Sequence, residues 1–167
     1  MGLTGRHAVP AALLLGIVLF LASLTGLPTE AADNFQRERI TVTTKDGKVH
    51  QFDVELAVTP RQREQGLMNR REMAADRGML FAFGETRQVL MWMKNTYLPL
   101  DMLFIGKDGR IRTIRENAEP LSEAIIDSKV PVDFVLELNG GTAKALGIRN
   151  GNRVDSPLIE RMRASGG

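Results

Sequence analysis

Alternating apolar and polar side chains dominate the chain from residue 39 onward. Residues 39–43 and 51–58 alternate with a period of two, which is typical of strands that bury one face. The tripeptide Lys-Asp-Gly at 45–47 lies between them and indicates a hairpin. A three-residue loop with a left-handed glycine places Ile40 opposite Phe52 and keeps one face apolar, whereas a two-residue loop mixes the faces. We therefore predict the three-residue loop.

The same tripeptide recurs at 107–109, between two further apolar stretches. We predict strands over 98–105 and 110–116, joined by a loop of the same kind. The corresponding register places Asp101 opposite Arg115. The recurrence reflects local turn chemistry and does not indicate a repeat protein.

The remaining predicted elements are short. Thr59 and Gln62 form a capping box, so a helix begins after Thr59, and Gly66 is expected to end it. We also predict strands at 79–83, 89–93 and 132–138, and one or two helical turns at 141–146. These patterns predict a mainly β fold with one or two short helices, arranged as a compact barrel-like single domain that hides its strand edges. The alternative is a two-layer β sandwich.

The N-terminal region has the pattern of a secretory signal peptide. Arg6 precedes an apolar run over 9–24, and small residues follow. We expect an exported protein, periplasmic or extracellular; the alternative is an uncleaved anchor over 9–27. The predicted organisation is a signal peptide or anchor at 1–32, a polar lead-in at 33–38, a single β-rich domain at 39–155 and a loose C-terminal tail at 156–167.

Composition limits the chemistry. The chain has 167 residues, 22 Lys and Arg against 20 Asp and Glu, no Cys and two His. Small net charge and expected export argue against a nucleic-acid partner. Thiolate catalysis and structural zinc sites of Cys and His are excluded, and no phosphate-loop or dinucleotide motif is present. We expect no cofactor and no metal site, and we interpret His50, on the apolar face of its strand, as a core or rim histidine.

Polar residues at the end of an apolar strand form the first candidate site. Trp92, the single tryptophan, is followed by Lys94 and Asn95. Binding residues concentrate in loops beside rigid strands, and a tryptophan with such neighbours can hold a small polar ligand by stacking and hydrogen bonding. The alternative is a core tryptophan followed by a turn.

Three charged residues extend this candidate site. Asp101 shares a strand face with apolar residues, so it is either a structural ion pair or backbone cap, or a functional carboxylate. Glu137 lies on the opposite strand face from Phe134 and is either a solvated residue or a second functional carboxylate. Arg63 lies in a helix where it opposes the macrodipole, so it either contacts an anionic ligand or belongs to a solvated basic face.

Methionines offer a further alternative. Six of them lie close together in the sequence: Met68, Met73, Met79, Met91, Met93 and Met102. Thioethers bind Cu(I), and copper handling would fit an exported protein. Methionine is also a common core residue, and this is the simpler interpretation.

Several short motifs together resemble a known family. They are Thr59-Pro60, Glu64-Gln65-Gly66-Leu67-Met68 with Arg70, Gly78-Met79-Leu80-Phe81, Trp92-Met93-Lys94-Asn95-Thr96, Pro99-Leu100-Asp101, Val135-Leu136-Glu137-Leu138 with Gly141, and Gly147-Ile148 before Gly151. Their order and spacing resemble the domain of unknown function 192 family. The resemblance implies a small exported or membrane-anchored bacterial protein and supports a single β domain. It implies no activity or site residues, since the family's biochemical role is not established.

The leading hypothesis is an exported, non-enzymatic domain that binds a small polar ligand or a cell-envelope component. Its site would be formed by Trp92, Lys94, Asn95, Asp101, Glu137 and Arg63, at a rim of strand ends. A membrane contact is expected only through an uncleaved N-terminal segment. The alternatives are a hydrolase or lyase that uses Asp101 and Glu137 as an acid/base pair, and a methionine-based copper-binding protein.

Overall fold

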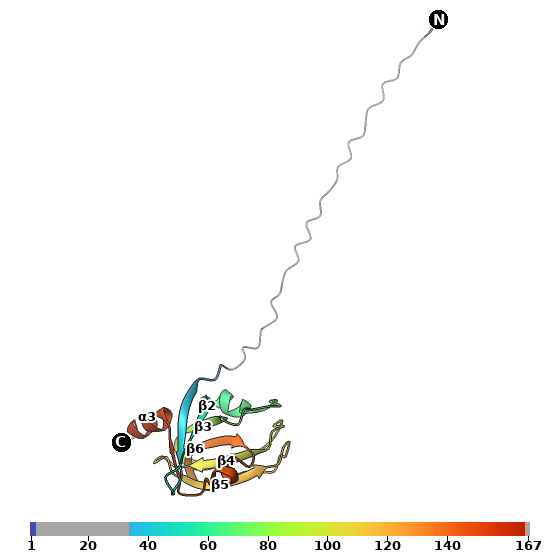
Figure 1. The fold of residues 1–167 in the computed structure, drawn as a ribbon. Helices are drawn as coiled ribbons and strands as arrows, with labels where there is room; N and C mark the ends of the chain where they lie inside the picture. Colours follow the sequence, from blue (N-terminus) through green and yellow to red (C-terminus); the bar gives the residue numbers. More distant parts are fainter. Residues whose placement is uncertain (3–33, 166–167) are drawn as a thin grey trace. The chain divides into compact units, whose positions relative to one another are not determined.

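The computed structural model describes residues 1–2 and 34–165, so the predicted signal peptide, apart from Met1 and Gly2, lies outside the described residues. The unit from Asp33 onward contains every element described here. Its strands are β1 (Arg37–Thr43), β2 (Val49–Ala57), β3 (Arg77–Met91), β4 (Leu100–Ile105), β5 (Ile111–Ala118), β6 (Ile126–Asn139) and β7 (Arg153–Asp155), and its helices are α1 (Pro60–Gln65), α2 (Thr142–Leu146) and α3 (Pro157–Ala164) (Figure 1). None of the helices in the described ranges is long and apolar enough to span a membrane.

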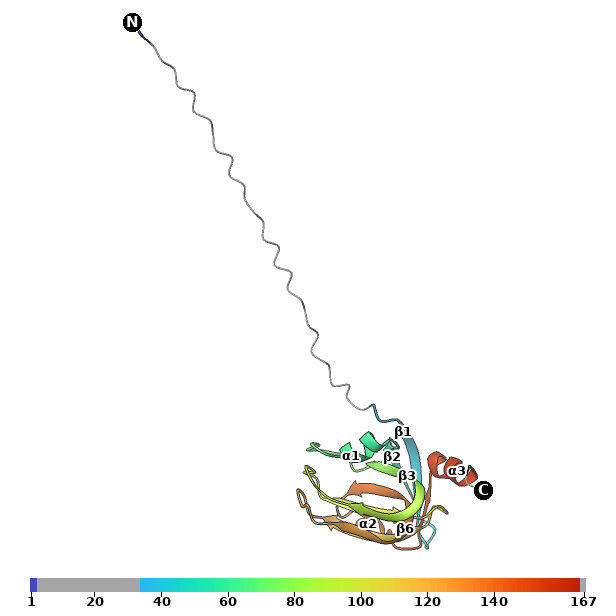
Figure 2. The same ribbon diagram turned by 180° about the vertical axis from the view of Figure 1, so that it is seen from behind.

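The described strands form one curled sheet in the order β5-β4-β6-β3-β2-β1-β7 (Figure 2). Neighbouring strands are antiparallel except for the parallel pair β2–β3. The two edges meet, because Arg110 and Arg153 form an isolated bridge and the Ile111 amide donates to the Asn152 carbonyl over 2.9 Å. The structure therefore confirms a mainly β, barrel-like single domain, whose curled sheet joins its two edges at this bridge.

Two hydrophobic cores lie on opposite faces of the sheet. The first receives residues from all seven described strands and from α3, and fills the interior of the curled sheet. The second contains residues of β3, β4 and β6 together with Leu67 and Met93, which lie in segments between strands. In β6 the alternation places Leu136 in the first core and Val135 in the second. The central strands are therefore buried on both faces.

The two Lys-Asp-Gly hairpins differ in register. In the first, Ile40 pairs with Phe52 and Gly47 has a φ of +82°, as predicted. In the second, irregularities shift the pairing so that Arg115 lies opposite Met102. The predicted pair of Asp101 and Arg115 is therefore wrong, because a bulge changes which residue faces the partner strand.

Two predicted boundaries also need correction. The strands predicted at 79–83 and 89–93 are parts of one strand, β3, which ends at Met91 and whose pairing with β6 contains register shifts. The predicted loose tail at 156–167 contains α3. The Ser156 side chain caps this helix by accepting from the Ile159 amide over 3.2 Å, and Leu158 and Ile159 pack into the first core.

Asp101 stabilises the connection between β4, the end of β5 and α2. Its carboxylate is fully buried and accepts backbone N–H groups from Asn117 over 2.7 Å, Gly141 over 3.0 Å and Ala143 over 2.7 Å. These donors satisfy the buried charge, since hydrogen bonds to an ionised group are strong. The structure thus gives Asp101 the role of a cap on backbone amides.

Replacing Asp101 by alanine leaves three backbone donors without their acceptor. We expect Asp101→Ala to lower the free energy of unfolding by at least about 3 kcal/mol, since each hydrogen bond to a charged group contributes about 1.5–3 kcal/mol. Chemical denaturation followed by circular dichroism measures the change. The matched control is Glu119→Ala. Glu119 is an exposed carboxylate just after the end of β5, so its removal should change the free energy of unfolding by no more than about 0.5 kcal/mol. Equal stabilities of the two variants would contradict this role.

Candidate functional site

A cavity of about 240 Å³ opens on the face of the sheet that carries the second core. Its lining comes from α1 and the turn after it, from β3 and from β6. The lining residues are Arg63, Glu64, Gln65, Gly66, Leu67, Met68, Phe81, Phe83, Arg87, Leu90, Met91, Trp92, Thr96 and Glu137. Three residues predicted from the sequence, Trp92, Arg63 and Glu137, therefore line one cavity.

Glu137 lies near the C-terminal end of β6, which pairs with β3 on one side and β4 on the other. Its neighbours across the sheet are Met79 of β3 and Met102 of β4, both fully buried. The Glu137 side chain is only 4% exposed, and no hydrogen bond or ion pair reaches its carboxyl group from residues 1–2 or 34–165. Burial raises the pKa of Glu137 to about 8. At neutral pH the group is mainly a neutral acid, which can both donate and accept a hydrogen bond.

The position of Glu137 follows from strand alternation and from what covers the sheet. Alternation correctly placed this residue on the face opposite Phe134. Of the two alternatives for Glu137, the solvated residue is wrong, because Leu67 and Met93 cover that face of the sheet. Close packing continues beside it: a Cβ atom on Gly78 would lie 2.5 Å from the backbone oxygen of Glu137. Only glycine allows β3 to approach β6 this closely.

Two guanidinium groups share one aromatic ring at the cavity. The Arg63 guanidinium lies 5.7 Å from the centre of the Phe83 ring, and that of Arg87 lies 4.9 Å from it. Arg63 donates to the carbonyls of Val58 over 2.6 Å and Ala82 over 2.9 Å. Burial and, secondly, the charge of Arg87 lower the pKa of Arg63.

The charges of these two arginines are only partly compensated. Arg87 pairs with Glu85 over 3.4 Å, whereas Arg63 has no carboxylate partner within the described part of the chain. Like charges held this close repel each other, and an anion between them would relieve the repulsion. The cavity lining therefore offers a neutral acid on β6 and positive charge near Phe83.

The tryptophan segment contributes one wall. Trp92 is 44% exposed, and the Lys94 ammonium lies 5.3 Å from the centre of its ring. Asn95 is exposed, has a φ of +55° and does not line the cavity. Its carbonyl accepts the Asn69 amide over 2.8 Å, which fixes a turn. The structure therefore places Trp92 at the cavity, with Lys94 over its ring. Asn95 forms part of a turn beside it.

Asp101 and Glu137 do not share a cleft. Asp101 pairs with Leu138, while Glu137 pairs with Met102 on the same two strands. Neighbouring residues of a strand point to opposite faces, so the two carboxyl groups lie on opposite sides of the sheet. Asp101 is also fully engaged by backbone amides. The structure contradicts the hypothesis of an acid/base pair formed by these residues.

The methionines mainly fill the second core. Met79, Met93 and Met102 are fully buried there, and Met73 and Met91 pack against it. Across the described residues, no group of three or more His, Cys, Asp or Glu side chains is arranged to hold a metal ion. The positions of the buried methionines are those of core residues.

Sequence reasoning missed Arg87. The polar run at 84–88 lies between the strands predicted at 79–83 and 89–93, so the sequence pattern places Arg87 in neither strand. The structure continues β3 through this run with register shifts, and Arg87 reaches the same cavity as Arg63. The alternation of Phe81 and Phe83 with small residues ends at Gly84, so the sequence pattern gives no signal that the strand continues through the polar run.

Comparisons with known proteins identify the family. A crystal structure of a candidate transcription regulator from Sinorhizobium meliloti 1021 is 65% identical in sequence, with a TM-score of 0.72, and covers 72% of this chain and 94% of that one. A protein of unknown function from Novosphingobium aromaticivorans DSM 12444 is 38% identical, with a TM-score of 0.72 and coverage of 75% and 89%. A search of curated proteins found no match. The family model DUF192, described as "Uncharacterized ACR", matches residues 41–156, and the chain therefore belongs to the DUF192 family.

Proposed function

We propose that this protein binds a small organic anion with an apolar body in the cavity that contains Glu137. One observation carries the proposal: the buried carboxyl group of Glu137, which has no partner among the described residues, lines a cavity that also presents apolar side chains and two arginines. An apolar pocket with a few converging polar groups and a perturbed acid is the usual form of a ligand site.

Each part of the cavity suits one part of such a ligand. Phe81 and Trp92 offer aromatic surface to the apolar body. Arg63 and Arg87 hold the anionic end, and neutral Glu137 donates its proton to an acceptor on the ligand. No cysteine, serine or histidine is among the described residues that line the cavity, which favours binding over catalysis.

The Sinorhizobium relative supports ligand binding only indirectly. That protein is described as a candidate transcription regulator, and many regulators respond to small molecules. A net charge of +2 gives this chain little general affinity for DNA. We therefore favour the small anion over a nucleic acid, and we keep a methionine-based copper site only as an outcome to be tested by Cu(I) titration.

We also propose that the protein is exported. The proposal is supported by the charge, the apolar run and the small residues of segment 1–32, which lies outside the described structure apart from its first two residues.

Intrinsic fluorescence provides a test of ligand binding, because Trp92 is the single tryptophan and lines the cavity. Benzoate, benzyl alcohol and benzylamine are matched probes that differ in charge. At pH 6.5 we expect benzoate to change Trp92 fluorescence saturably and to bind at least about tenfold more tightly than benzylamine. Arg87→Gln should weaken benzoate binding by about tenfold, whereas Arg115→Gln, which does not line this cavity, should leave it unchanged. Stronger binding of benzylamine, or no response to any probe, would refute the proposal.

Glu137 should make stability depend on pH. Its pKa is about 8 in the folded chain, against an ordinary value of 4.5 for a glutamate, so between these values the folded state binds more protons than the unfolded state. Stability contributed by the neutral acid is fully present below pH 4.5 and is lost as pH rises toward 8. We expect the free energy of unfolding to fall by up to about 1.4 kcal/mol per pH unit in this window.

The matched variant for this test is Glu137→Gln, which stays neutral at every pH. Denaturant unfolding at pH 5 and pH 9 should show that Glu137→Gln is more stable than the natural protein at pH 9, with a much smaller difference at pH 5. Parallel stability profiles for the two proteins would show that Glu137 is not the titrating group.

Export is tested with the full chain carrying a C-terminal tag in a Gram-negative host. We expect the protein in the periplasmic fraction, with an intact mass that corresponds to cleavage after Ala31 or Ala32, where small residues follow the apolar run. Full-length protein in the membrane fraction would support the anchor alternative, and full-length protein in the cytoplasm would contradict export.

A further inference from the structure

A second, larger cavity of about 910 Å³ lies away from the first and shares no lining residue with it. It is formed by the β1–β2 turn, the middle of β5, α2 and the segment that leads to β7. Its lining residues are Thr44, Lys45, Asp46, Lys48, His50, Ile114, Glu116, Lys144, Ala145, Leu146, Gly147, Ile148, Arg149, Asn150 and Asn152.

Positive charge predominates in this cavity. Lys48 pairs with Asp46 over 2.9 Å, and the Thr44 hydroxyl followed by Lys48 lowers the pKa of Asp46 to about 2. Lys48 is thus already neutralised by an acid that stays ionised at neutral pH.

The other three cations lack such a partner. Lys45, Lys144 and Arg149 are exposed and have no carboxylate partner in the ranges that the structure describes. Glu116 of β5 is the remaining acid in the lining. The cations come from two separate parts of the chain, the β1–β2 turn and the α2–β7 region, and face one hollow.

His50 lines the same cavity and carries a buried polar atom, Nε2, without a hydrogen-bond partner among the described residues. A buried polar atom left unpaired is destabilising, and native proteins contain few of them. An imidazole N–H is a good donor to an anionic oxygen.

We propose that this cavity binds a small, multiply charged anion of the phosphate class. Arg149 offers a planar fork for two oxygens, while Lys45 and Lys144 provide point charges around it. Several oxygens that share more than one negative charge match three cations that face a single remaining acid, Glu116, better than a single carboxylate does. The apolar residues Ile114, Leu146 and Ile148 leave room for an attached organic group.

Inorganic pyrophosphate is a suitable probe, with phosphate and acetate at equal ionic strength for comparison. We expect pyrophosphate, titrated into the full chain and followed by ¹H–¹⁵N NMR, to shift amide signals of the β1–β2 turn and the α2–β7 segment. Lys144→Gln and Arg149→Gln should each weaken binding by about five- to tenfold. Arg161→Gln, on α3 and outside the cavity lining, should leave affinity unchanged. Because the two cavities share no residue, Trp92 fluorescence should not respond to pyrophosphate.

Three results would overturn this proposal. Equal effects of acetate and pyrophosphate would show that only ionic strength acts on this surface. Unchanged affinity in both the Lys144 and Arg149 variants would place the anion elsewhere. Tighter binding of a duplex oligonucleotide through the same residues would make this a nucleic-acid surface instead of a small-anion site.

Discussion

Burial of β6 on both faces is the constraint on which the rest of the structure depends. One face packs Phe134 and Leu136 into the interior of the curled sheet, and the other packs Val135 into the second core. Antiparallel sheets commonly leave one face to water, but here segments containing Leu67 and Met93 cover it. Glu137 is therefore removed from water by its neighbours in the fold, and its raised pKa follows from that burial. The first cavity is the space that this covering layer leaves open.

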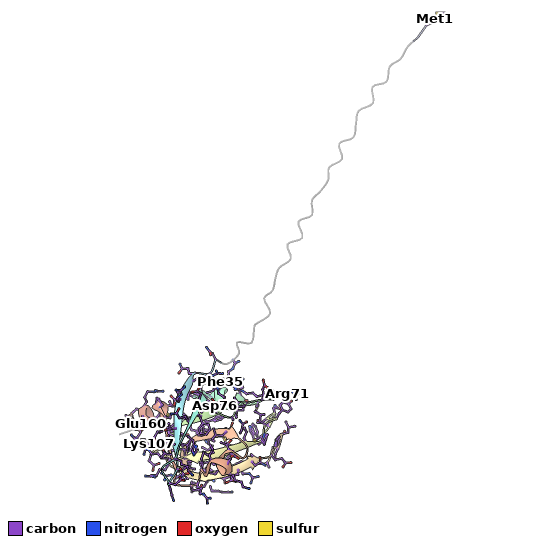
Figure 3. The ribbon with its side chains drawn as sticks, viewed as in Figure 1. Met1, Phe35, Arg71, Asp76, Lys107 and Glu160 are labelled. Carbon is purple, nitrogen blue, oxygen red and sulfur yellow. The ribbon has the colours of Figure 1, made fainter. Side chains whose placement is uncertain are left out.

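Closure of the sheet produces the second hollow. The bridge between Arg110 and Arg153 joins the two edge strands, and α3 packs its buried side chains into the interior core. With the edges joined, the β1–β2 turn and the α2–β7 segment surround a common space. The same backbone pairing that hides the strand edges thus brings cations distant in sequence together. In Figure 3 the labels of Lys107, in the turn between β4 and β5, and of Glu160 in α3 lie on the left of the domain, and that of Arg71 lies on the right.

Features set by neighbouring residues, such as turns and helix caps, could be predicted from the sequence more fully than features set by contacts between distant segments. The register of the first hairpin followed from Gly47 and the apolar face, and the capping box at Thr59 correctly located α1. The register predicted for the second hairpin is wrong, because the sequence of a strand pair that contains a bulge does not differ visibly from that of a regular pair. Alternation placed Glu137 on the correct face. Its burial depends on segments about forty or more residues away in sequence, and no pattern within β6 reports them.

Two unfavourable arrangements meet at the first cavity, and a single ligand would relieve both. A buried acid without a partner is destabilising, even when neutral, because its hydrogen-bonding capacity is unused. Two guanidinium groups over the Phe83 ring are destabilising because their charges repel. Either arrangement alone has a structural explanation: an acid can be tolerated in a core, and arginines can pack on an aromatic ring. An organic anion would satisfy the arginines with its charge and Glu137 with an acceptor atom, while its body replaces water against Trp92. The unpartnered acid and the two arginines line the same cavity of about 240 Å³, which favours a binding site over an imperfectly packed core.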